Sequence, residues 1–414
     1  MTTARSEPAL ERFTLGVNYW PRRKAMGWWS SFDREEVEDE FALIAALGLD
    51  VVRVFLLWDD WQPEPTRVDR ARLRDLGDVC DVAARHGLGL DVTFFTGHMS
   101  GPNWAPGWLL GDGPYPAAGP RRQVVSGGLP VARSYRNPFT DPVALAAQRL
   151  LLRTVVEAYG EHEAIWLWNL GNEPDLFAWP PSAPAGRAWV AAMTALIHDL
   201  DDRHPVTCGL HFPSLLEDNG LRVHDVFAET DAAVMHAYPM YTPWARGPLD
   251  PDLVPFSCAL TSALCGKPTL MEEWGGPTLP AGEASRVVTW TSRGQQRSQF
   301  MASEEDLDAY VSAVLPRLVA GGAAGAMLWC FADYHESLWD RPPCDEALHE
   351  RSFGLVRSDG STKPHARTLA RFARTAPQRR SEAIDRVGLD VTSEVYYRAP
   401  EEHARRLYQA YLEG

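Results

Sequence analysis

Short apolar runs and longer amphipathic stretches alternate along the chain from residue 14 to about residue 370. The apolar runs are rich in β-branched and aromatic residues, as buried strands are. Eight such runs predict strands over 13–20, 50–58, 88–96, 164–170, 205–210, 232–238, 267–274 and 325–331.

Between these runs, apolar residues recur at three- and four-residue spacing, which predicts amphipathic helices. Near-continuous apolar strands that alternate with helices indicate a parallel sheet covered by helices. Eight such units fit an α/β fold of the closed (β/α)8 TIM barrel type. An open doubly wound sheet would need a glycine-rich phosphate turn after its first strand, and "NYWPRRKAMGWW" is not one. The clearest helical segments are 34–48, 71–87, 142–160, 185–202 and 303–322.

Two of the segments that follow strands are long, namely 97–140 after the third strand and 332–353 after the eighth. Their Trp, Pro and Arg content predicts ordered walls at the C-terminal face of the barrel, where barrel enzymes build their sites. We therefore expect a catalytic barrel over residues 1–370 and a short C-terminal extension over 371–414. Residues 379–414 are expected to form a strand-like piece and a terminal helix packed on the barrel.

Composition and charge narrow the range of partners. Hydrophobic residues make up 45% of the 414 residues and charged residues 23%, which is ordinary for a soluble globular protein. The net charge of −15 disfavours nucleic acid and anionic membrane, because binding phosphate requires a basic face. The first residues lack an apolar signal region, and no apolar stretch approaches the roughly 18 residues of a membrane span. We expect a cytoplasmic protein; composition does not specify its oligomeric state.

Cysteine and tryptophan usage adds two expectations. The six cysteines are scattered, without a CxxC pair or a Cys/His cluster at metal-ligand spacing, so we expect reduced thiols and no metal. The 16 tryptophans are more informative, because a flat, rigid aromatic surface suits both cores and stacking against sugar rings.

Glutamates stand at the ends of two predicted strands. Glu173 closes the fourth strand, and Glu272 and Glu273 close the seventh. Strand ends that are distant in sequence converge on one mouth of a barrel, so a pair of carboxylates across it is physically plausible, although a single Glu after a strand is usually a solvated surface group. Because successive strand side chains point to opposite faces, we expect one of Glu272 and Glu273 to line the barrel and the other to face the helices or a loop. Alternation alone does not say which.

Two of these strand ends carry a family resemblance. The "NEP" at 172–174 after an aromatic strand, and "EWG" at 273–275 after "KPTLME", resemble the acid/base and nucleophile motifs of clan A glycoside hydrolases, and most resemble family 5, the cellulase and mannanase family. The resemblance extends over roughly residues 14 to 370. It implies that Glu173 is the general acid/base and Glu273, rather than Glu272, the nucleophile. On this basis Glu273→Ala should be nearly inactive, and Glu272→Ala should keep most activity.

The same resemblance implies further site residues. Asn172 would hold the 2-hydroxyl of the sugar being cleaved, Arg53 would lie under the nucleophile and keep it ionised, and Tyr238 would hydrogen-bond the nucleophile. Taken singly, each such residue also has an ordinary structural explanation, such as an ion pair or core packing. The remaining candidates for substrate binding are His236, which pairs with Tyr238; Trp329, the floor of the sugar subsite; His98, whose "TGHMSG" setting departs from the family pattern; and Trp58 and Trp104.

The implied mechanism is a retaining double displacement without metal or cofactor. Arg53 and Tyr238 would favour an ionised Glu273, and the charge of Glu273 would raise the pKa of Glu173, so that the two carboxyl groups differ in protonation at one pH.

The long third and eighth loops are expected to close one end of the groove with Trp104, Trp108 and Trp339. A pocket of that kind suits removal of a terminal sugar from a small oligosaccharide or β-glycoside. The segments "LGVNYWP" and "FLLWDDWQP" resemble the β-mannosidase-like branch of family 5, which favours an exo-acting β-mannosidase. A β-glucosidase or β-galactosidase, an endo-β-mannanase or glucanase and, from another class, a non-catalytic sugar-binding barrel are the alternatives.

Overall fold

The computed structural model describes residues 12–111, 122–378 and 386–413. Parts of three predicted segments therefore lie outside the described residues: the first eleven residues, 112–121 of the third loop, and 379–385 and 414 of the C-terminal extension.

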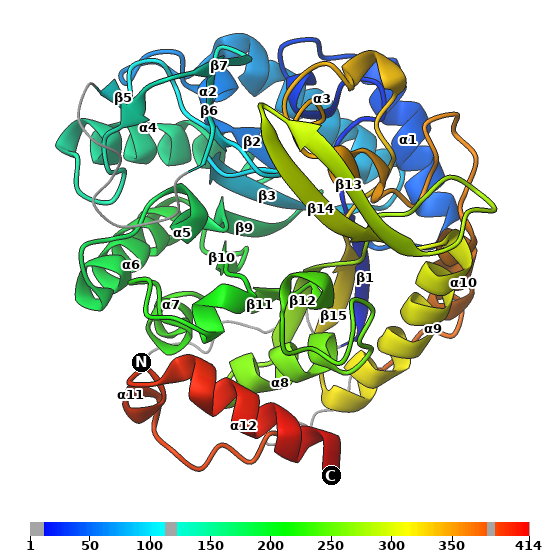
Figure 1. Cartoon of the computed structure of the whole chain (residues 1–414). Coiled ribbons are helices and arrows are strands. Elements are labelled where there is room, and N and C mark those ends of the chain that lie inside the picture. Colours follow the sequence, from blue (N-terminus) through cyan, green and yellow to red (C-terminus); the bar gives the residue numbers. More distant parts are fainter. Residues whose placement is uncertain (1–11, 112–121, 379–385, 414) are drawn as a thin grey trace.

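Eight parallel strands form one sheet that is nearly closed into a barrel, which confirms the predicted fold class (Figure 1). The two outer strands of the sheet order, β10 and β11, also meet, because His236 N donates to Leu210 O at 3.0 Å. The sheet order is β10-β9-β3-β2-β1-β15-β12-β11. The strands are β1 (Thr14–Asn18), β2 (Val51–Leu57), β3 (Gly89–Thr96), β9 (Ile165–Asn172), β10 (Val206–Gly209), β11 (Ala233–His236), β12 (Thr269–Trp274) and β15 (Gly325–Leu328).

Each predicted run contains one of these strands, and the differences lie at the ends. β9 continues to Asn172, two residues beyond the predicted end, because Asn172 pairs with Gly209 of β10. β15 ends at Leu328 rather than at 331.

The five predicted helices are present, and each begins after an Asp or Ser side chain that accepts hydrogen bonds from the N–H groups of the first turn. These caps define the helix starts more sharply than apolar spacing does. The helices are α1 (Arg34–Ala46), α3 (Arg70–Arg85), α4 (Pro142–Tyr159), α6 (Ala183–Leu200) and α9 (Glu304–Gly321).

Three further helices of the outer layer, α7 (Val223–Glu229), α8 (Leu253–Cys265) and α10 (Pro364–Ala373), were not apparent from the sequence. Nearly every residue of α8 is buried, so it lacks the polar face by which a surface helix is recognised. Its outer side is covered by the C-terminal helix α12 (Pro400–Glu413), where the Tyr408 ring lies 4.9 Å from that of Phe256.

The C-terminal region differs from the expectation in one respect. The described residues 386–392 form no strand, and a short helix, α11 (Ser393–Tyr396), precedes α12. Side chains fix this region to the barrel: Tyr397 Oη donates to Ser214 O at 2.8 Å, and Tyr408 Oη donates to Asp250 Oδ2 at 2.6 Å. Helix α10 runs across residue 370, where the boundary of the barrel was expected.

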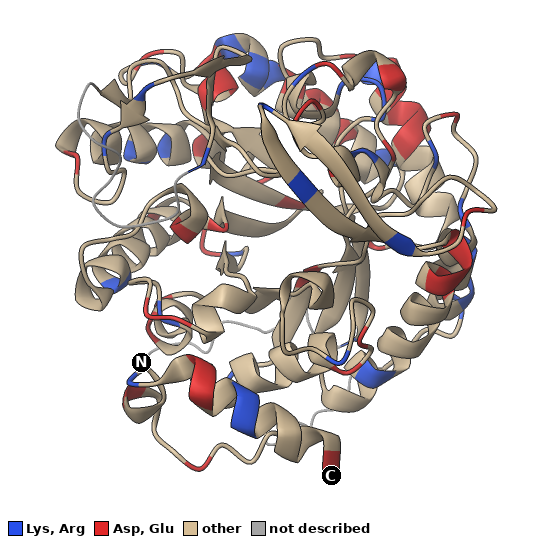
Figure 2. Cartoon of the chain, in the orientation of Figure 1, with Lys and Arg blue, Asp and Glu red and all other residues tan. Residues whose placement is uncertain are grey.

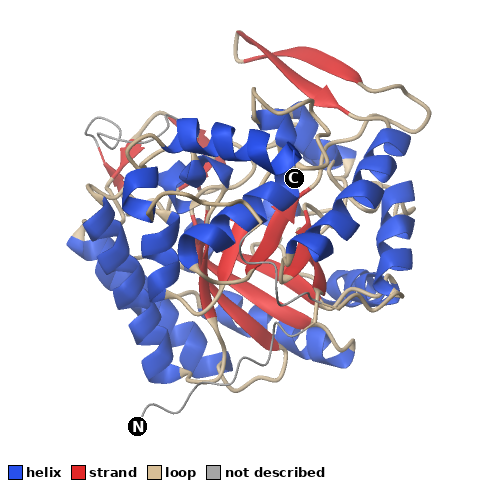
Figure 3. Ribbon diagram, turned by 90° about the horizontal axis from the view of Figure 1, so that it is seen from below, coloured by secondary structure: helices blue, strands red, loops and turns tan. Residues whose placement is uncertain are grey.

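A β-hairpin that the sequence analysis did not identify lies between β12 and α9. Strands β13 (Arg286–Ser292) and β14 (Gln295–Met301) pair in antiparallel register (Figure 1), and the hairpin projects from the body of the molecule (Figure 3). Arg293 and Gly294 form its two-residue turn with φ of 50° and 72°, as a type I′ turn requires. The alternation in "VVTWTS" followed by Arg-Gly was the available signal.

The other connections are short helices or strands around the mouth of the barrel. They are α2 (Trp58–Trp61), β4 (Asn103–Trp104), β5 (Leu110–Gly111), β6 (Val124–Ser126), β7 (Leu129–Val131), β8 (Ser134–Tyr135), α5 (Pro174–Phe177), and the 3-10 helices η1 (Ala25–Gly27), η2 (Phe212–Leu215), η3 (Pro239–Tyr241), η4 (Glu336–Leu338) and η5 (Leu348–Ser352).

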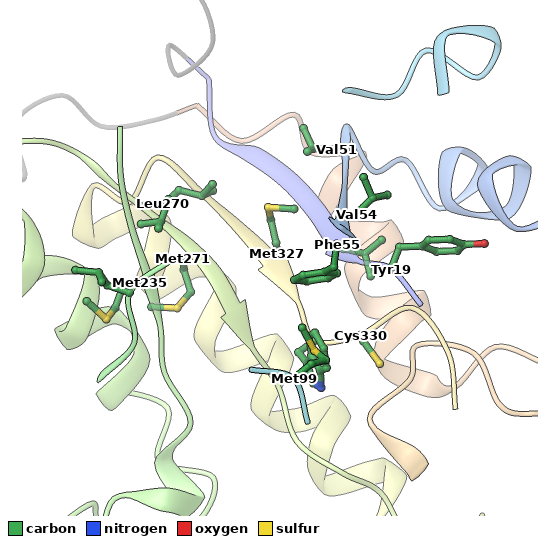
Figure 4. Packing of buried hydrophobic residues seen from close by; sticks show 14 of the residues in the cluster. Tyr19, Val51, Val54, Phe55, Met99, Met235, Leu270, Met271, Met327 and Cys330 are labelled. Atoms are coloured by element: carbon green, nitrogen blue, oxygen red, sulfur yellow. The ribbon is translucent and has the colours of Figure 1, made fainter. Parts of the chain in front are cut away.

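The core is apolar inside the barrel and between the sheet and the helices, and Figure 4 shows part of it around Val51, Leu270 and Met327. Strand β1 approaches its neighbours so closely that a Cβ on Gly16 would lie 2.7 Å from Val51 O and 2.9 Å from Met327 Cγ. Acidic and basic residues are interspersed over the surrounding helices (Figure 2). None of the described helices has the length and apolar character needed to cross a membrane.

The packing of α12 on α8 can be tested with Tyr408→Ala. Loss of the buried ring and of its hydrogen bond to Asp250 is expected to lower the free energy of unfolding by about 3 kcal/mol, measured by urea denaturation. The exposed neighbour Gln409→Ala is the control. Equal stability of the two variants would show that α12 is not docked as described.

Candidate active site

Glu173 stands directly after β9, at the mouth of the barrel. Its backbone is in the left-handed region, with φ 44° and ψ 56°, and its N–H donates to Gly209 O at 2.9 Å. This conformation costs a non-glycine residue about 1–3 kcal/mol and is typical of functional sites. Pro174 follows at the first position of α5, so the chain leaves the sheet at the point where the carboxylate enters the mouth.

The guanidinium of Arg53, from β2, is fully buried among polar groups of the neighbouring strands. Its Nη1 donates to Glu273 Oε1 at 2.5 Å, and its Nη2 donates to Asn172 Oδ1 at 3.1 Å and lies 3.3 Å from Glu272 Oε2. The Nε atom donates to Thr93 Oγ1 at 2.8 Å. Arg53 therefore holds the residues of both sequence motifs in one network.

Both Glu272 and Glu273 point into the barrel, which corrects the expectation that strand alternation would separate them. Met235 pairs with Met271, but the next residue of β11, His236, pairs with Glu273. On the other side of β12, Met271 pairs with Ala326, and Trp274 pairs with Leu328. Strand β12 thus has one residue more than either neighbour, and a bulge of this kind re-aims side chains that regular alternation would separate.

Two imidazoles flank Glu173. His236 Nδ1 lies 3.0 Å from Glu173 Oε1, and the other ring nitrogen, Nε2, lies 2.9 Å from Glu272 Oε2. His211 Nδ1 lies 3.6 Å from Glu173 Oε1, and its Nε2 lies 2.7 Å from Asp175 Oδ2. The sequence analysis did not identify His211, Asp175 or Glu272 as site residues, although His211 and Asp175 directly follow predicted strands or motifs.

The carboxylates of this network shift the pKa of His236 upward. Burial alone would lower the pKa of His236, but Glu273, Glu173 and Glu272 raise it to about 9. His236 therefore carries a proton on each ring nitrogen at neutral pH and donates to two carboxylates.

Glu173 and Glu273 are shifted in opposite directions. Burial would raise the pKa of Glu173, but the charges of His211 and His236 outweigh burial and lower it below its usual range. Burial raises the pKa of Glu273, although His236 and Arg53 oppose this. The expected net rise in the pKa of Glu173 is therefore wrong for the unliganded site, because the expectation considered Glu273 and left out the histidines.

The remaining motif residues surround the two glutamates. Tyr238 Oη donates to Glu273 Oε2 at 3.2 Å, and Asn172 Nδ2 donates to His98 O at 3.1 Å. His98 Nδ1 is bonded to Asn103 Oδ1 at 2.8 Å, and burial lowers the pKa of His98 to about 3, so its ring is neutral. Its Nε2 is 4.0 Å from Glu173 Oε2.

These residues line a pocket of about 670 Å³, a volume typical of small-molecule sites. Trp329, which directly follows β15, is part of its wall. The two long loops contribute, as expected, with residues such as Ser100 and Glu350, and the hairpin contributes Trp290 and residues 296–299.

Four tryptophans expected at the substrate lie elsewhere. Trp58 and Trp104, expected to bind substrate, are almost fully buried. Trp58 Nε1 donates to Gln62 Oε1 at 2.8 Å, and Trp104 Nε1 donates to Met99 O at 3.2 Å. Trp108 packs against Trp58, and Trp339 packs under the guanidinium of Arg351. None of the four lines the pocket.

Glu173, His236 and Glu273 each offer a ligand atom within 4.8 Å of the others, which is close enough to surround a cation. Positive charge is already present here, because the Arg53 guanidinium is bonded to Glu273 and a protonated His236 donates to Glu173. The cluster is therefore better suited to proton transfer than to metal binding.

The burial of Glu272 changes what its removal should do. Glu272→Ala leaves Arg53 and His236 short of a buried partner, so we expect a loss of about 3–5 kcal/mol in the free energy of unfolding and a reduced activity, instead of the near-normal activity implied by the family resemblance. Urea denaturation and kcat/KM measure the two effects, with the exposed Glu336→Ala as the control. A variant as stable and active as the control would contradict the network.

Comparison with known proteins agrees with this architecture. Residues 122–374 match the family model described as glycosyl hydrolases family 2, TIM barrel domain. A mannan endo-1,4-beta-mannosidase A from Hypocrea jecorina is 24% identical over 316 residues, which cover 66% of this chain and 64% of that enzyme. The chain thus spans less than two thirds of that relative.

Solved structures share the fold. A GH5_18 variant from Streptomyces cattleya in complex with Manb1-4GlcNAc has a TM-score of 0.72 and 20% identity, with 95% of this chain and 92% of that chain covered. An exo-beta-1,4-mannosidase from Opitutaceae bacterium strain TAV5 has a TM-score of 0.69 and 25% identity, with 88% and 60% covered. These similarities confirm the predicted resemblance to clan A glycoside hydrolases of the family 5 mannosidase type. Because the matched model covers more than half of its residues, the chain belongs to the glycosyl hydrolases family 2, TIM barrel domain family.

Proposed function

We propose that the protein is a retaining, exo-acting β-mannosidase that removes terminal β-mannosyl residues from short oligosaccharides. One observation carries the proposal: a carboxyl oxygen of Glu173 and one of Glu273 lie within 4.8 Å of each other in a walled pocket. Retaining glycosidases hold their two carboxyl groups about 5–5.5 Å apart, and inverting ones about 6.5–9.5 Å apart.

In the first step Glu273 attacks the anomeric carbon, and the bond from that carbon to the leaving oxygen breaks as Glu173 protonates the oxygen. Arg53 and Tyr238 orient the Glu273 carboxylate for the attack. Glu173 needs a proton that its own lowered pKa does not provide, and His236 Nδ1 holds one 3.0 Å away. We assign His236 as the source of this proton.

In the second step Glu173 takes a proton from water, which then attacks the glycosyl ester on Glu273 and restores the free carboxylate. The negative charge of Glu273 is absent from the ester, so the proton can pass through Glu173 back to His236. We assign Asn172, which is bonded to Arg53 and to the His98 carbonyl, to the 2-hydroxyl in both steps.

The shape of the pocket supports exo action. The loop after β3 and the loop after β15 meet where Ser100 lies beside Glu350. The hairpin is fixed to the second of these loops, because Trp290 Nε1 donates to Glu346 O at 2.9 Å and Arg297 forms an ion pair with Glu346. Walls of this kind leave little room for a polymer that continues in both directions. Mannose as the sugar is supported by the mannosidases and mannanases among the similar proteins.

A panel of nitrophenyl β-glycosides, with the products followed by NMR, tests sugar and stereochemistry together. We expect the β-mannoside to be cleaved fastest, with mannose released first as the β-anomer, and Glu273→Ala to be nearly inactive. Initial release of the α-anomer would refute retention. Faster cleavage of the glucoside or galactoside would change the assignment of the sugar. Mid-chain cleavage of mannan would refute exo action. Binding without turnover of any glycoside would instead indicate a sugar-binding barrel.

The role of His236 predicts a pH dependence. The proton is present below the His236 pKa of about 9 and is lost as the pH rises through it, so kcat/KM should fall near pH 9. In His236→Gln, Glu173 depends on its own proton, and this fall should move to lower pH. The surface variant His162→Gln is the control. An unchanged alkaline limb in His236→Gln would exclude His236 as the proton source.

A further inference from the structure

A third carboxyl group in the pocket has no part in the mechanism above. Glu350 belongs to η5 in the loop after β15, is 9% exposed and lines the pocket. Ser100 and Trp329 are its polar neighbours, and it is close enough to Glu273 and Glu173 to interact with their charges. The carboxyl group is therefore at the sugar subsite and not at the rim.

Glu350 lacks a cationic partner in the described parts of the chain. Among those residues it forms no ion pair with a Lys or Arg, and its nearest basic group is His349 Nε2 at 3.5 Å. Burial and the charge of Arg297 lower the pKa of His349 to about 4, so that ring is neutral at pH 7. A buried carboxyl group without a cationic partner is unfavourable, and in a ligand pocket a ligand hydroxyl can supply a further hydrogen bond.

Ser100 faces the same space from the opposite loop. Its hydroxyl is buried and lies beside the Glu350 carboxyl group, whose pKa this contact lowers. Its backbone φ of 54° shows that the loop holds it in a conformation that serine rarely adopts. A ligand hydroxyl placed between the two side chains could donate to Glu350 and accept from Ser100.

The catalytic groups leave only part of the sugar for this pair. The proposed mechanism requires the anomeric carbon between Glu173 and Glu273 and assigns the 2-hydroxyl to Asn172. Glu350 bonds none of these residues, so the hydroxyls available to it are those on carbons 3, 4 and 6.

We propose that Glu350, together with Ser100, is the specificity-determining site that binds a free hydroxyl on carbon 3, 4 or 6 of the terminal sugar and so restricts cleavage to unsubstituted chain ends. This inference rests on the proposed glycosidase function. It deepens that function by naming the part of the substrate that the pocket recognises.

The site also has a pH dependence. Burial raises the pKa of Glu350 to about 7, and the ionised form is the stronger acceptor, so KM should fall as the pH rises through about 7. Other titratable or charged groups face Glu350 or the adjacent His349. They are Glu173, Glu273, Tyr238, Tyr241, Tyr334, Cys330, Cys344, His349 and Arg297. The two glutamates are shifted in opposite directions, Glu173 below its usual pKa and Glu273 above it, so the loss of the KM change in Glu350→Gln is what assigns the change to Glu350.

The test is a series of deoxy substrates on the full-length enzyme and on Glu350→Gln. In the wild type, removal of the 3-, 4- or 6-hydroxyl from nitrophenyl β-mannoside should lower kcat/KM at least about tenfold at one position. In Glu350→Gln that same deletion should change kcat/KM by less than about threefold, with KM raised more than kcat is lowered. The KM change near pH 7 should be lost as well.

Two controls separate a binding role from a structural one. The 2-deoxy analogue should be discriminated equally by both enzymes, because Asn172 reads that hydroxyl, and the exposed Glu336→Gln should behave as wild type. Equal discrimination at positions 3, 4 and 6 in both enzymes would overturn the proposal. If Glu350→Gln does not fold, wild-type indifference to all three deletions would also overturn it.

Failure of the proposed function gives a different result. A wild type that prefers another β-glycoside, or inverts configuration, refutes the β-mannosidase assignment, and the same deoxy series made on the preferred glycoside then tests Glu350 independently.

Discussion

The buried guanidinium of Arg53 is the interaction on which the site depends. A bare carboxylate inside a barrel is strongly unfavourable, and three glutamates converge here, so a fixed cation has to accompany them. Arg53 is always charged and has donors in a rigid planar arrangement, which allows it to bond groups from several strands at once. Its partners come from β1, β3, β9 and β12: Asn18, Thr93, Asn172, Glu272 and Glu273. The same contacts that join the sheet strands thus hold the carboxylates to which we assign the reaction.

Two local departures from regular structure aim the carboxylates that Arg53 neutralises. The extra residue in β12 turns Glu272 and Glu273 to the same side, and the left-handed backbone at Glu173 directs its side chain across the mouth. A regular strand would present only one glutamate to the interior. With both inside, Glu272 accepts from His236 and Asn169 and completes the charge balance, while Glu273 keeps an oxygen bonded to Tyr238 in the pocket.

The sequence predicts the barrel well, because each strand is buried on both faces and therefore reads as an apolar run whatever its neighbours are. The sequence does not predict the elements whose form depends on tertiary contacts. Helix α8 was hidden because α12 covers its outer side, and the bulge in β12 depends on the registers of two neighbouring strands. In the site, Glu173, Glu273, Asn172 and Arg53 follow from their motifs, whereas His211 and Glu350 stand in segments without one. Trp58 and Trp104 were misplaced because an aromatic residue near a strand end looks the same whether it faces a ligand or the core.

The histidines change how the proposed acid/base chemistry of Glu173 has to be understood. With only two carboxylates in view, the repulsion between them would keep a proton on Glu173. In the structure His236 donates to Glu173 and Glu272 and takes up that proton, so the unliganded site is a pair of carboxylates with a shared cation between them. Moving the proton from His236 to Glu173 removes one positive and one negative charge together, and the net charge of the buried site stays constant. A charge-neutral shift over 3.0 Å inside the buried site requires little rearrangement of its surroundings, so on the proposed mechanism Glu173 can be ionised in the free site and still protonate a leaving oxygen.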